Sequence, residues 1–310
     1  MKVAFVFPGQ GSQTVGMFDA WQDNAVAMEV VHQASQALDQ DLPGLMHRGP
    51  ASDLNLTINT QPVMLAASFA MYQAWLAAGG RVPAIMAGHS LGEYTALTAA
   101  GALAADDALR LVRVRASTMQ NTVPVGEGGM AAILGLDDAT VEAVCKQAAE
   151  EEVVEAVNFN APSQVVIAGH VAAVDRACEL AREQGARRAM KLSVSAPFHS
   201  SLLRSAATVL AQALDGIEIH TPAVPVINNV DVASPGTPAA IRDALTRQAW
   251  HAVRWVETIQ AMRMQGVTHV VECGPGKVLT GLTRRIDKSL VALSINDPDT
   301  LQQALDTLQG

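Results

Sequence analysis

Cysteine is scarce in this sequence, with three residues among 310: Cys145, Cys178 and Cys273. The number is odd, the three lie far apart in the chain, and none belongs to a CxxC pair. Disulfide frameworks and zinc sites require pairs or clusters of cysteines at short spacings. The pattern therefore argues against both kinds of site and favours a reducing compartment, so we expect a cytoplasmic protein without a bound metal.

Positive charge is also in short supply. Lys and Arg number 21 against 30 Asp and Glu, so the formal net charge is −9 at pH 7. A protein that binds nucleic acid needs a basic face to neutralise phosphates, so we expect no nucleic-acid partner. No apolar run approaches the roughly 20 residues of a transmembrane helix, and the first residues lack the pattern of a signal peptide. We accordingly expect no membrane partner. We also expect a monomer.

What the chain does have is a large apolar fraction. Apolar residues make up 49% of the sequence and charged residues 16%, which excludes a disordered chain. Hydrophobic periodicity and glycine stops predict strands at 2–7 and 84–87 and helices at 62–79, 93–99 and 106–120. Such alternation is typical of an α/β fold with a parallel sheet and crossover helices.

A middle stretch, residues 128–195, has a different order of elements. It predicts a strand, a helix, two strands around an Asn-Ala-Pro-Ser turn, a second helix and a last strand. That βαββαβ order is the ferredoxin-like unit, and its length suits a small inserted domain. Helical and strand segments then resume, including one predicted helix that holds Trp250 and Trp255. We therefore predict a discontinuous core and an inserted ferredoxin-like subdomain: residues 1–125 with 198–310, and residues 126–197.

The strongest local signal is Gly88-His89-Ser90-Leu91-Gly92, which matches the G-x-S-x-G nucleophile elbow. A predicted strand precedes it and a predicted helix follows it, as that turn requires. The glycines let the strand and the helix pass close together, so the Ser90 hydroxyl projects at the helix N-terminus. The N–H of Leu91 then points to where a tetrahedral oxyanion would form. A chance glycine-rich turn is the alternative, but the context on both sides favours catalysis.

A serine needs a base to become a nucleophile, and the chain has eight histidines. His89 lies inside the elbow, where its side chain should point away from Ser90, so we expect a structural role. His199 differs from the rest because it lies in SAPFHSS, a proline-containing loop at the predicted subdomain boundary, where a cleft would open. No acidic residue after Ser90 stands in a recognisable triad setting, which favours a backbone carbonyl as the group that orients the base.

Two arginines, Arg113 and Arg115, flank the apolar stripe of the predicted helix at 106–120 on opposite sides. Periodicity does not choose between them, and a solvated position is the ordinary outcome for each. An arginine buried near the serine would instead indicate a carboxylate in the substrate, because the guanidinium fork matches that group bidentately.

The loop after the first predicted strand reads Gly9-Gln10-Gly11-Ser12-Gln13-Thr14. It begins like the dinucleotide-binding motif, but position 14 is threonine and no acidic ribose partner ends a second strand, so that interpretation is weak. In an elbow enzyme the second oxyanion N–H comes from a different strand-to-helix loop. The flanking glycines let the backbone of Gln10 approach a substrate oxygen, and we predict that its N–H supplies that group.

Together these residues resemble one family over essentially the whole chain, the malonyl-CoA:acyl carrier protein transacylases of type II fatty acid synthesis. The matching stretches follow one another in this order: FPGQGSQ, TQPVMLAAS, AGHSLGEYTAL, VRVRASTMQ, GGMAAILGL, VNFNAPSQVVIAG, SAPFHSSLL, NNV with the downstream RQAWHAVRW, and ECGPGKVLTGL. Several separate motifs in one order make the resemblance highly specific. It implies an α/β-hydrolase-like core that carries a ferredoxin-like subdomain.

The resemblance also implies a reaction. Ser90 would be the nucleophile that becomes malonylated, and His199 would be its general base, held by the main-chain carbonyl of Gln248. Malonyl-CoA would be the donor and acyl carrier protein the acceptor, in ping-pong acyl transfer without a metal or organic cofactor.

Further residues receive roles from the same resemblance. Arg115 would bind the free carboxylate of malonate, and the N–H groups of Gln10 and Leu91 would form the oxyanion hole. His89 and Asn160 would lie near the site without direct contact to the reacting atoms.

Phe198 precedes the expected base, where some members of the family carry serine. A phenylalanine beside the acyl pocket should narrow it and disfavour a branched methylmalonyl group by about 1–3 kcal/mol.

Three alternatives remain at the level of sequence. An acyltransferase of polyketide synthesis or of malonate decarboxylase would share this chemistry, and the sequence separates the pathways poorly. A serine thioesterase or esterase would share the elbow but would not need a buried Arg115. A non-catalytic scaffold would require a lost nucleophile or base, and neither is lost.

Overall fold

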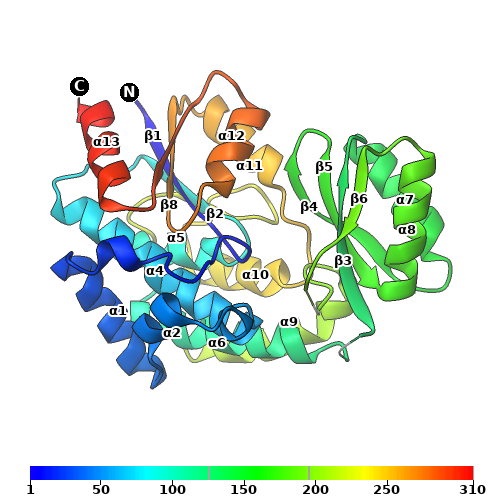
Figure 1. Cartoon of the computed structure of the whole chain (residues 1–310), viewed down its shortest axis with the longest axis horizontal. Helices are drawn as coiled ribbons and strands as arrows, with labels where there is room; N and C mark the ends of the chain where they lie inside the picture. Colours follow the sequence, from blue (N-terminus) through cyan, green and yellow to red (C-terminus); the bar gives the residue numbers. More distant parts are fainter. Residues whose placement is uncertain (125, 195, 310) are drawn as a thin grey trace.

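The computed structural model describes residues 1–124, 126–194 and 196–309, which form a large and a small lobe (Figure 1). The large lobe is built on a sheet with the strand order β7-β2-β1-β8-β9, in which every described pairing is parallel. Its strands are β1 (Val3–Phe7), β2 (Ile85–Gly88), β7 (Val226–Ile227), β8 (His269–Cys273) and β9 (Val291–Ile295).

Helices cover both faces of this sheet, and β1 shows why its sequence is apolar throughout. Phe5 and Phe7 pack into the cluster that contains α4, while Ala4 and Val6 pack on the other face with residues of α11 and α12. Successive side chains of a strand point to opposite faces, so a strand covered on both sides needs apolar residues at every position.

The large lobe contains most of the helices. They are α1 (Ala25–Leu38), α2 (Leu42–Arg48), α3 (Ala51–Leu54), α4 (Thr57–Ala77), α5 (Gly92–Ala99), α6 (Ala105–Asn121), α9 (Arg204–Asp215), α10 (Pro238–Gln248), α11 (Trp255–Met264), α12 (Val278–Ile286) and α13 (Pro298–Gln309), with 3-10 turns η1 (Asp19–Trp21) and η2 (Ser201–Leu203). Across the described ranges, none of the helices combines the length and the apolar character that a membrane span needs.

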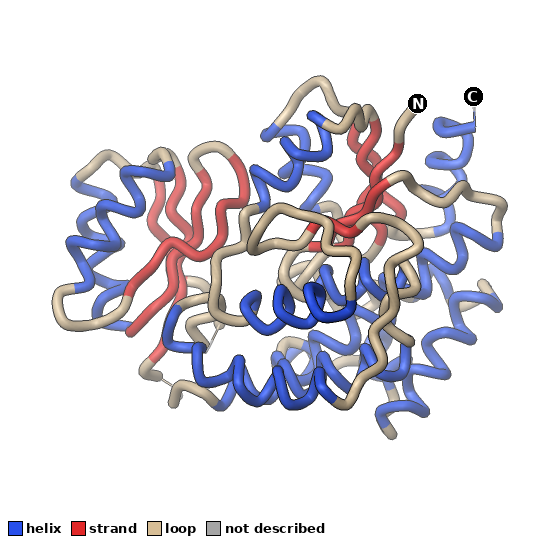
Figure 2. The backbone as a smooth tube through the Cα atoms, turned by 180° about the vertical axis from the view of Figure 1, so that it is seen from behind, coloured by secondary structure: helices blue, strands red, loops and turns tan. Residues whose placement is uncertain are grey.

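The small lobe holds an antiparallel sheet with the order β4-β5-β3-β6. Its elements are β3 (Gly128–Leu134), α7 (Asp138–Ala149), β4 (Val154–Ala161), β5 (Gln164–His170), α8 (Val171–Glu183) and β6 (Arg188–Lys191), which is the order that the sequence predicts. Figure 2 shows α7 and α8 on the outer side of this sheet. The inner face, with Met130 and Val166, packs instead against Met119 of α6 and Phe198.

The predicted helix that holds Trp250 and Trp255 is wrong, because the chain leaves the helix between them. α10 ends at Gln248 and α11 begins at Trp255. Between them Val253 is drawn against β4: its N–H donates to the carbonyl of Val157 at 2.8 Å and its carbonyl accepts from Phe159 at 3.0 Å. The break leaves the last carbonyls of α10 without helical partners, so they are available to other donors.

Two further boundaries differ from the sequence prediction. The last strand of the small lobe ends at Lys191, short of the predicted residue 195, which lies outside the described residues. Residues 125 and 310, which end the two predicted core segments, lie outside them as well.

Candidate active site

Ser90 lies in a tight turn between β2, which ends at Gly88, and α5, which begins at Gly92. Its φ is 51°, a left-handed conformation that non-glycine residues rarely adopt and that nucleophile elbows use. A Cβ on Gly88 would overlap the backbone of Gly92, so only glycine permits this crossing. The Ser90 N–H is held by the Asn229 side-chain oxygen at 2.7 Å. The turn therefore presents the hydroxyl in one fixed direction.

His199 is within reach to act as the base. Its Nε2 lies 2.7 Å from the Ser90 Oγ, and its Nδ1 lies 2.9 Å and 3.2 Å from the main-chain oxygens of Gln248 and His251. Because a carbonyl oxygen can only accept, Nδ1 carries the proton and the Nε2 lone pair faces the serine. The sequence predicts the first of these carbonyls through the family resemblance, but not the second.

The imidazole of His199 is neutral at ordinary pH. The ring is buried, and burial first and the positive charge of Arg115 second lower the pKa of His199 to about 3. A neutral imidazole with a free lone pair can accept the serine proton.

Arg115 comes from α6 and is 2% exposed, so the structure buries this arginine beside the serine. Its Nη2 donates to the Ser90 Oγ at 3.0 Å and to the Gln248 Oε1 at 3.0 Å, and its Nη1 donates to the Gln61 Oε1 at 2.9 Å. The guanidinium also lies 5.3 Å from the centre of the Tyr94 ring, a cation–π distance. An acyl group bound to the Ser90 oxygen would therefore lie next to this positive charge.

Arg113 takes the other position that periodicity allows, away from the buried site. It is only partly buried, and it donates to the Gln40 side chain, away from Ser90. The structure therefore distinguishes the two arginines where the sequence pattern did not.

The loop that carries Gln10 lies against the elbow. A Cβ on Gly9 would come within 2.5 Å of the His89 carbonyl oxygen and 3.8 Å of the Leu91 nitrogen, so the loop backbone approaches the turn closely. Neither the Gln10 N–H nor the Leu91 N–H donates to an acceptor within the described part of the chain. Both amides are therefore free to donate to a substrate oxygen. The Gln10 side chain donates to Thr57 at 3.3 Å.

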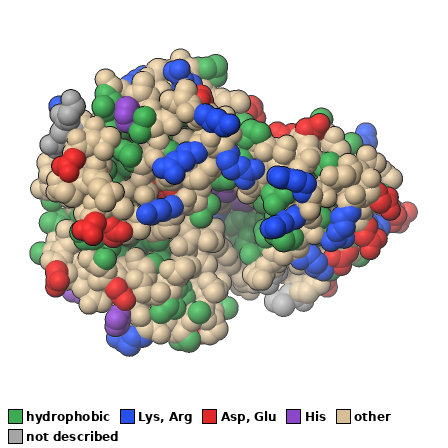
Figure 3. All heavy atoms as spheres, turned by 45° about the horizontal axis from the view of Figure 1, so that its top comes forward, with side chains coloured by type: hydrophobic (Ala, Val, Ile, Leu, Met, Phe, Trp, Pro, Cys, Tyr) green, Lys and Arg blue, Asp and Glu red, His purple; other side chains and the backbone are tan. Residues whose placement is uncertain are grey.

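These groups open into one cavity of about 200 Å³. Figure 3 shows the face in which the surface is hollowed between the lobes, with Lys and Arg side chains gathered around the hollow. Pockets for drug-sized ligands are about 300–1,000 Å³, so the cavity suits an acyl group better than a whole coenzyme. Its lining is Gln10, Gln61, His89, Ser90, Leu91, Arg115, Met119, Met130, Asn158, Asn160, Val166, Leu192, Val194, Phe198 and His199.

His89 and Asn160 form part of the cavity wall. The His89 Nε2 lies 2.7 Å from the Asn160 Oδ1, and its ring packs against Trp255 with centroids 5.4 Å apart. Burial lowers the pKa of His89, which keeps the ring neutral. The imidazole thus contacts Asn160 and not Ser90, although both residues line the same space.

The chain is similar to known proteins over almost its full length. Residues 4–296 match the family model described as acyl transferase domain. The chain is 52% identical over 306 residues to the malonyl CoA-acyl carrier protein transacylase of Escherichia coli strain K12, with 98% of this chain and 99% of that protein covered. The chain belongs to this acyl transferase family. The resemblance to the malonyl-CoA:acyl carrier protein transacylases is thereby confirmed.

Two solved structures of the acyl transferase family superpose on the chain almost completely. One is acyl-carrier-protein S-malonyltransferase from Burkholderia pseudomallei 1710b, with a TM-score of 0.98 and 62% identity over 99% of this chain and 100% of that chain. The other is a type II PKS acyl-carrier protein in complex with its malonyl-transacylase, with a TM-score of 0.98 and 46% identity over 99% and 100%.

Sequence reasoning missed three residues that hold this acyl transferase site together: Gln61, Glu93 and Asn229. All three occur inside the motifs that carry the family resemblance, but no local pattern shows what they touch. Asn229 is an example, because β7 ends at Ile227 and Asn229 lies in the turn that follows it.

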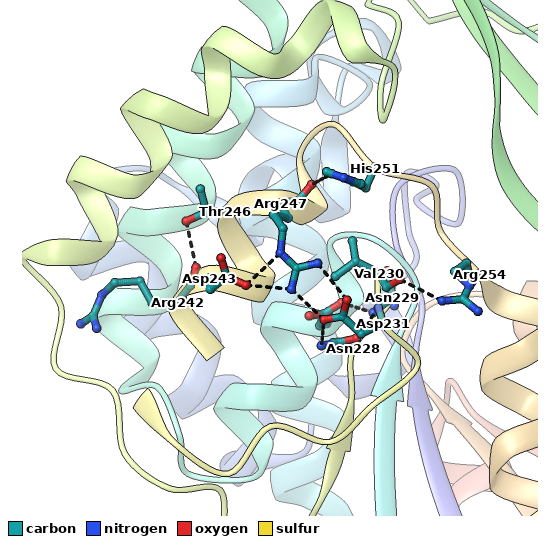
Figure 4. Close-up of polar contacts among 11 residues, drawn as sticks. Asn228, Asn229, Val230, Asp231, Arg242, Asp243, Thr246, Arg247, His251 and Arg254 are labelled. Carbon is teal, nitrogen blue, oxygen red and sulfur yellow. Dashed lines mark hydrogen bonds and ion pairs between the residues drawn. The ribbon is translucent and has the colours of Figure 1, made fainter. Parts of the chain in front are cut away.

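A salt bridge fixes that turn relative to α10 (Figure 4). Arg247 donates from α10 to both carboxylate oxygens of Asp231 at 2.8 Å and 2.7 Å, and to Asp243 at 2.8 Å. The same helix ends one residue later at Gln248, so the Asn229 turn is tied to the main-chain carbonyl that accepts from His199. Among the described residues, no group of three or more His, Cys, Asp and Glu side chains is placed to hold a metal ion.

Proposed function

We propose that this chain transfers the malonyl group of malonyl-CoA to the phosphopantetheine thiol of acyl carrier protein through a malonyl-Ser90 intermediate. The observation that carries this proposal is the buried Arg115 guanidinium 3.0 Å from the Ser90 Oγ. A buried cation beside the acylated oxygen calls for an acyl group with its own carboxylate. The printed names of the relatives support the same substrate pair.

In the first half-reaction, the Ser90 Oγ attacks the thioester carbonyl carbon and its proton passes to the His199 Nε2. The new oxyanion accepts from the N–H groups of Gln10 and Leu91, which have no other acceptor among the described residues. The tetrahedral intermediate collapses, the carbon–sulfur bond breaks, and the CoA sulfur takes the proton from His199.

The second half-reaction runs in the reverse sense. The carrier-protein thiol gives its proton to His199 and attacks malonyl-Ser90, and the Ser90 oxygen leaves with that proton. Every proton goes through one imidazole, so we propose that the transfer uses neither a metal nor an organic cofactor.

In this scheme Arg115 binds the carboxylate of the malonyl group. Acylation converts the Ser90 oxygen from a hydrogen-bonded hydroxyl into an ester, so Nη2 loses one of its acceptors. The malonyl carboxylate is three bonds from that oxygen and can take the vacated position. Holding the carboxylate there fixes the ester carbonyl toward the two N–H groups, because the malonyl chain is short.

We also propose a finer description of the fold. The parallel sheet with its elbow after β2 supports an α/β-hydrolase-like core. The βαββαβ order and the helices on one face of the second sheet support a ferredoxin-like subdomain. The proposed domains are residues 1–125 with 198–310, and residues 126–197.

The proposed setting is fatty acid synthesis in the cytoplasm, by a monomer. Three free, buried cysteines support a reducing compartment. Malonyl transfer in polyketide synthesis is the second candidate, because one structural neighbour is a complex with a type II PKS acyl-carrier protein. A thioesterase is disfavoured by the buried Arg115.

Release of CoA in the absence of an acceptor tests transfer against hydrolysis. With malonyl-CoA alone, transfer predicts one burst of CoA, stoichiometric with enzyme, and then very slow release. Steady rapid release of CoA would instead identify a thioesterase. Adding holo-acyl carrier protein after the burst should restart turnover.

A further inference from the structure

A buried carboxylate that the mechanism above does not use lies directly behind Ser90. Glu93 stands in the first turn of α5 and is 2% exposed. Its Oε2 accepts the backbone N–H of Asn229 at 2.8 Å and the side-chain Nε2–H of Gln248 at 2.9 Å. One carboxylate oxygen therefore joins α5 to the turn after β7 and to the end of α10.

Both donors to Glu93 are in direct contact with the nucleophile. The Asn229 side chain accepts from the Ser90 N–H at 2.7 Å and donates to the Gly88 carbonyl at 2.7 Å. The Gln248 Nε2 also donates to the Ser90 carbonyl at 2.9 Å. The elbow is thus held by hydrogen bonds to Asn229 and to Gln248, and both of these residues donate to Glu93.

Gln248 links Glu93 to the remaining groups of the site. Its Oε1 accepts from Arg115 at 3.0 Å, and its main-chain oxygen accepts from His199 at 2.9 Å. Only one orientation of the amide satisfies these contacts, with its oxygen toward the guanidinium and its NH₂ toward the carboxylate. A charge at each end holds that orientation more firmly than neutral partners would.

We propose that ionised Glu93 is a positioning residue that aligns Arg115 and Ser90 for acylation. It acts through the side chain of Gln248 and the backbone of Asn229, and this role rests on the proposed function. A proton on Glu93 would remove its charge, so Oε2 would hold the Gln248 amide and the Asn229 N–H more weakly. Acylation therefore slows as the pH falls through the range in which Glu93 takes up a proton.

The surroundings of Glu93 put that range near neutrality. Burial raises the pKa of Glu93 to about 7, against the lowering effect of the two hydrogen bonds and of Arg115 on α6. Asp231, in the turn after β7, raises it further and is itself kept ionised by Arg247, which lowers the pKa of Asp231. Tyr94, next to Glu93 on α5, stays neutral because burial raises its pKa to about 12.

The test is the rate of malonyl-Ser90 formation from malonyl-CoA, measured by rapid quench and intact mass between about pH 5 and 9, a range centred near the pKa of Glu93. The wild type should show an acid limb with a midpoint near 7. Burial lowers the pKa of His199 to about 3, so we expect its titration below this pH range and the Glu93 variants to identify the limb. Glu93→Gln keeps an acceptor oxygen without the charge, so its profile should be flat at a rate about 10-fold below the plateau of the wild type.

Two more variants separate positioning from folding. Glu93→Ala removes the acceptor as well and should lose about 100-fold at high pH, with KM for malonyl-CoA little changed. Glu272→Gln is the matched control, because Glu272 is also fully buried but accepts from the first turn of α12. This control should keep the acid limb of the wild type.

An unchanged acid limb in Glu93→Gln would overturn the proposal, and so would a flat wild-type profile. If neither Glu93 variant folds, the same pH profile is measured for Gln248→Met, which removes the side-chain amide but leaves the main-chain carbonyl. A retained acid limb would overturn the proposal, and a lost one would support it. A wild type that forms no adduct at any pH would refute the proposed function instead, which is a different result.

Discussion

Replacing Arg115 by alanine should separate malonyl from acetyl transfer. In the free protein the guanidinium donates to three neutral acceptors, Ser90 Oγ, Gln248 and Gln61, and a bound malonyl carboxylate would take the places of Ser90 Oγ and Gln61. Hydrogen bonds to a charged group contribute about 1–1.5 kcal/mol more than bonds to neutral groups, so two of them amount to about 2–3 kcal/mol. At about 1.4 kcal/mol per tenfold, Arg115→Ala should lower kcat/KM for malonyl-CoA by at least about 30- to 150-fold.

Acetyl-CoA offers no carboxylate, so its transfer should lose no more than about 10-fold, the worth of one neutral hydrogen bond. The assay is transfer from each CoA thioester to holo-acyl carrier protein under identical conditions, with a melting curve for each variant. Arg113→Ala is the matched control on the same helix, because Arg113 contacts Gln40 away from the site, and it should change neither rate. Equal losses on both substrates in Arg115→Ala would refute a carboxylate-binding role and leave Arg115 as a structural residue.

Three further predictions concern the loop that carries Gln10, the cavity wall at Phe198 and the buried carboxylate of Glu93. Gln10→Ala keeps the backbone N–H and should lower the acylation rate by less than about 10-fold. Gly9→Val places a Cβ against the His89 carbonyl and should lower that rate by about 10²–10³, as loss of an oxyanion donor does. Similar rates for the two variants in a single-turnover assay would show that this loop takes no part in the mechanism. Phe198→Ser should admit methylmalonyl-CoA, improving its kcat/KM relative to malonyl-CoA by about 10- to 150-fold, and competition between the two substrates measures this ratio. Folding raises the pKa of Glu93 from 4.5 to about 7, because the protein interior favours the neutral carboxyl group. The resulting contribution to the free energy of unfolding is complete below pH 4.5 and is lost as the pH rises through 7. Urea unfolding should therefore show the wild type losing roughly 3 kcal/mol relative to Glu93→Gln over that range, and a constant difference would mean that Glu93 titrates normally.

The parts of the site that the sequence predicts are local ones. The elbow around Ser90 depends on a strand, two glycines and a helix that are contiguous, so the motif contains its own structural context. The order of strands and helices in the small lobe follows from periodicity for the same reason. Leu109, Val112, Ala116 and Met119 form the apolar stripe of α6 and are all buried.

The remaining features depend on contacts between distant segments. Arg113 and Arg115 are equivalent by periodicity, and only the packing of α6 against the elbow distinguishes them. The helix break at Trp250 arises because Val253 pairs with β4, which no local propensity reveals. Glu93 and Asn229 are 136 residues apart, so their hydrogen bond could not be inferred from either neighbourhood.

The central claim is that Ser90 carries a malonyl group that a carrier-protein thiol then removes. Intact-mass measurement after incubation with malonyl-CoA, before and after addition of holo-acyl carrier protein, tests it most directly. The account predicts a mass increase of one malonyl group on the wild type, none on Ser90→Ala, and its quantitative transfer to the carrier protein. An adduct that persists in Ser90→Ala, or one that is lost to water and not to the carrier protein, would contradict the account.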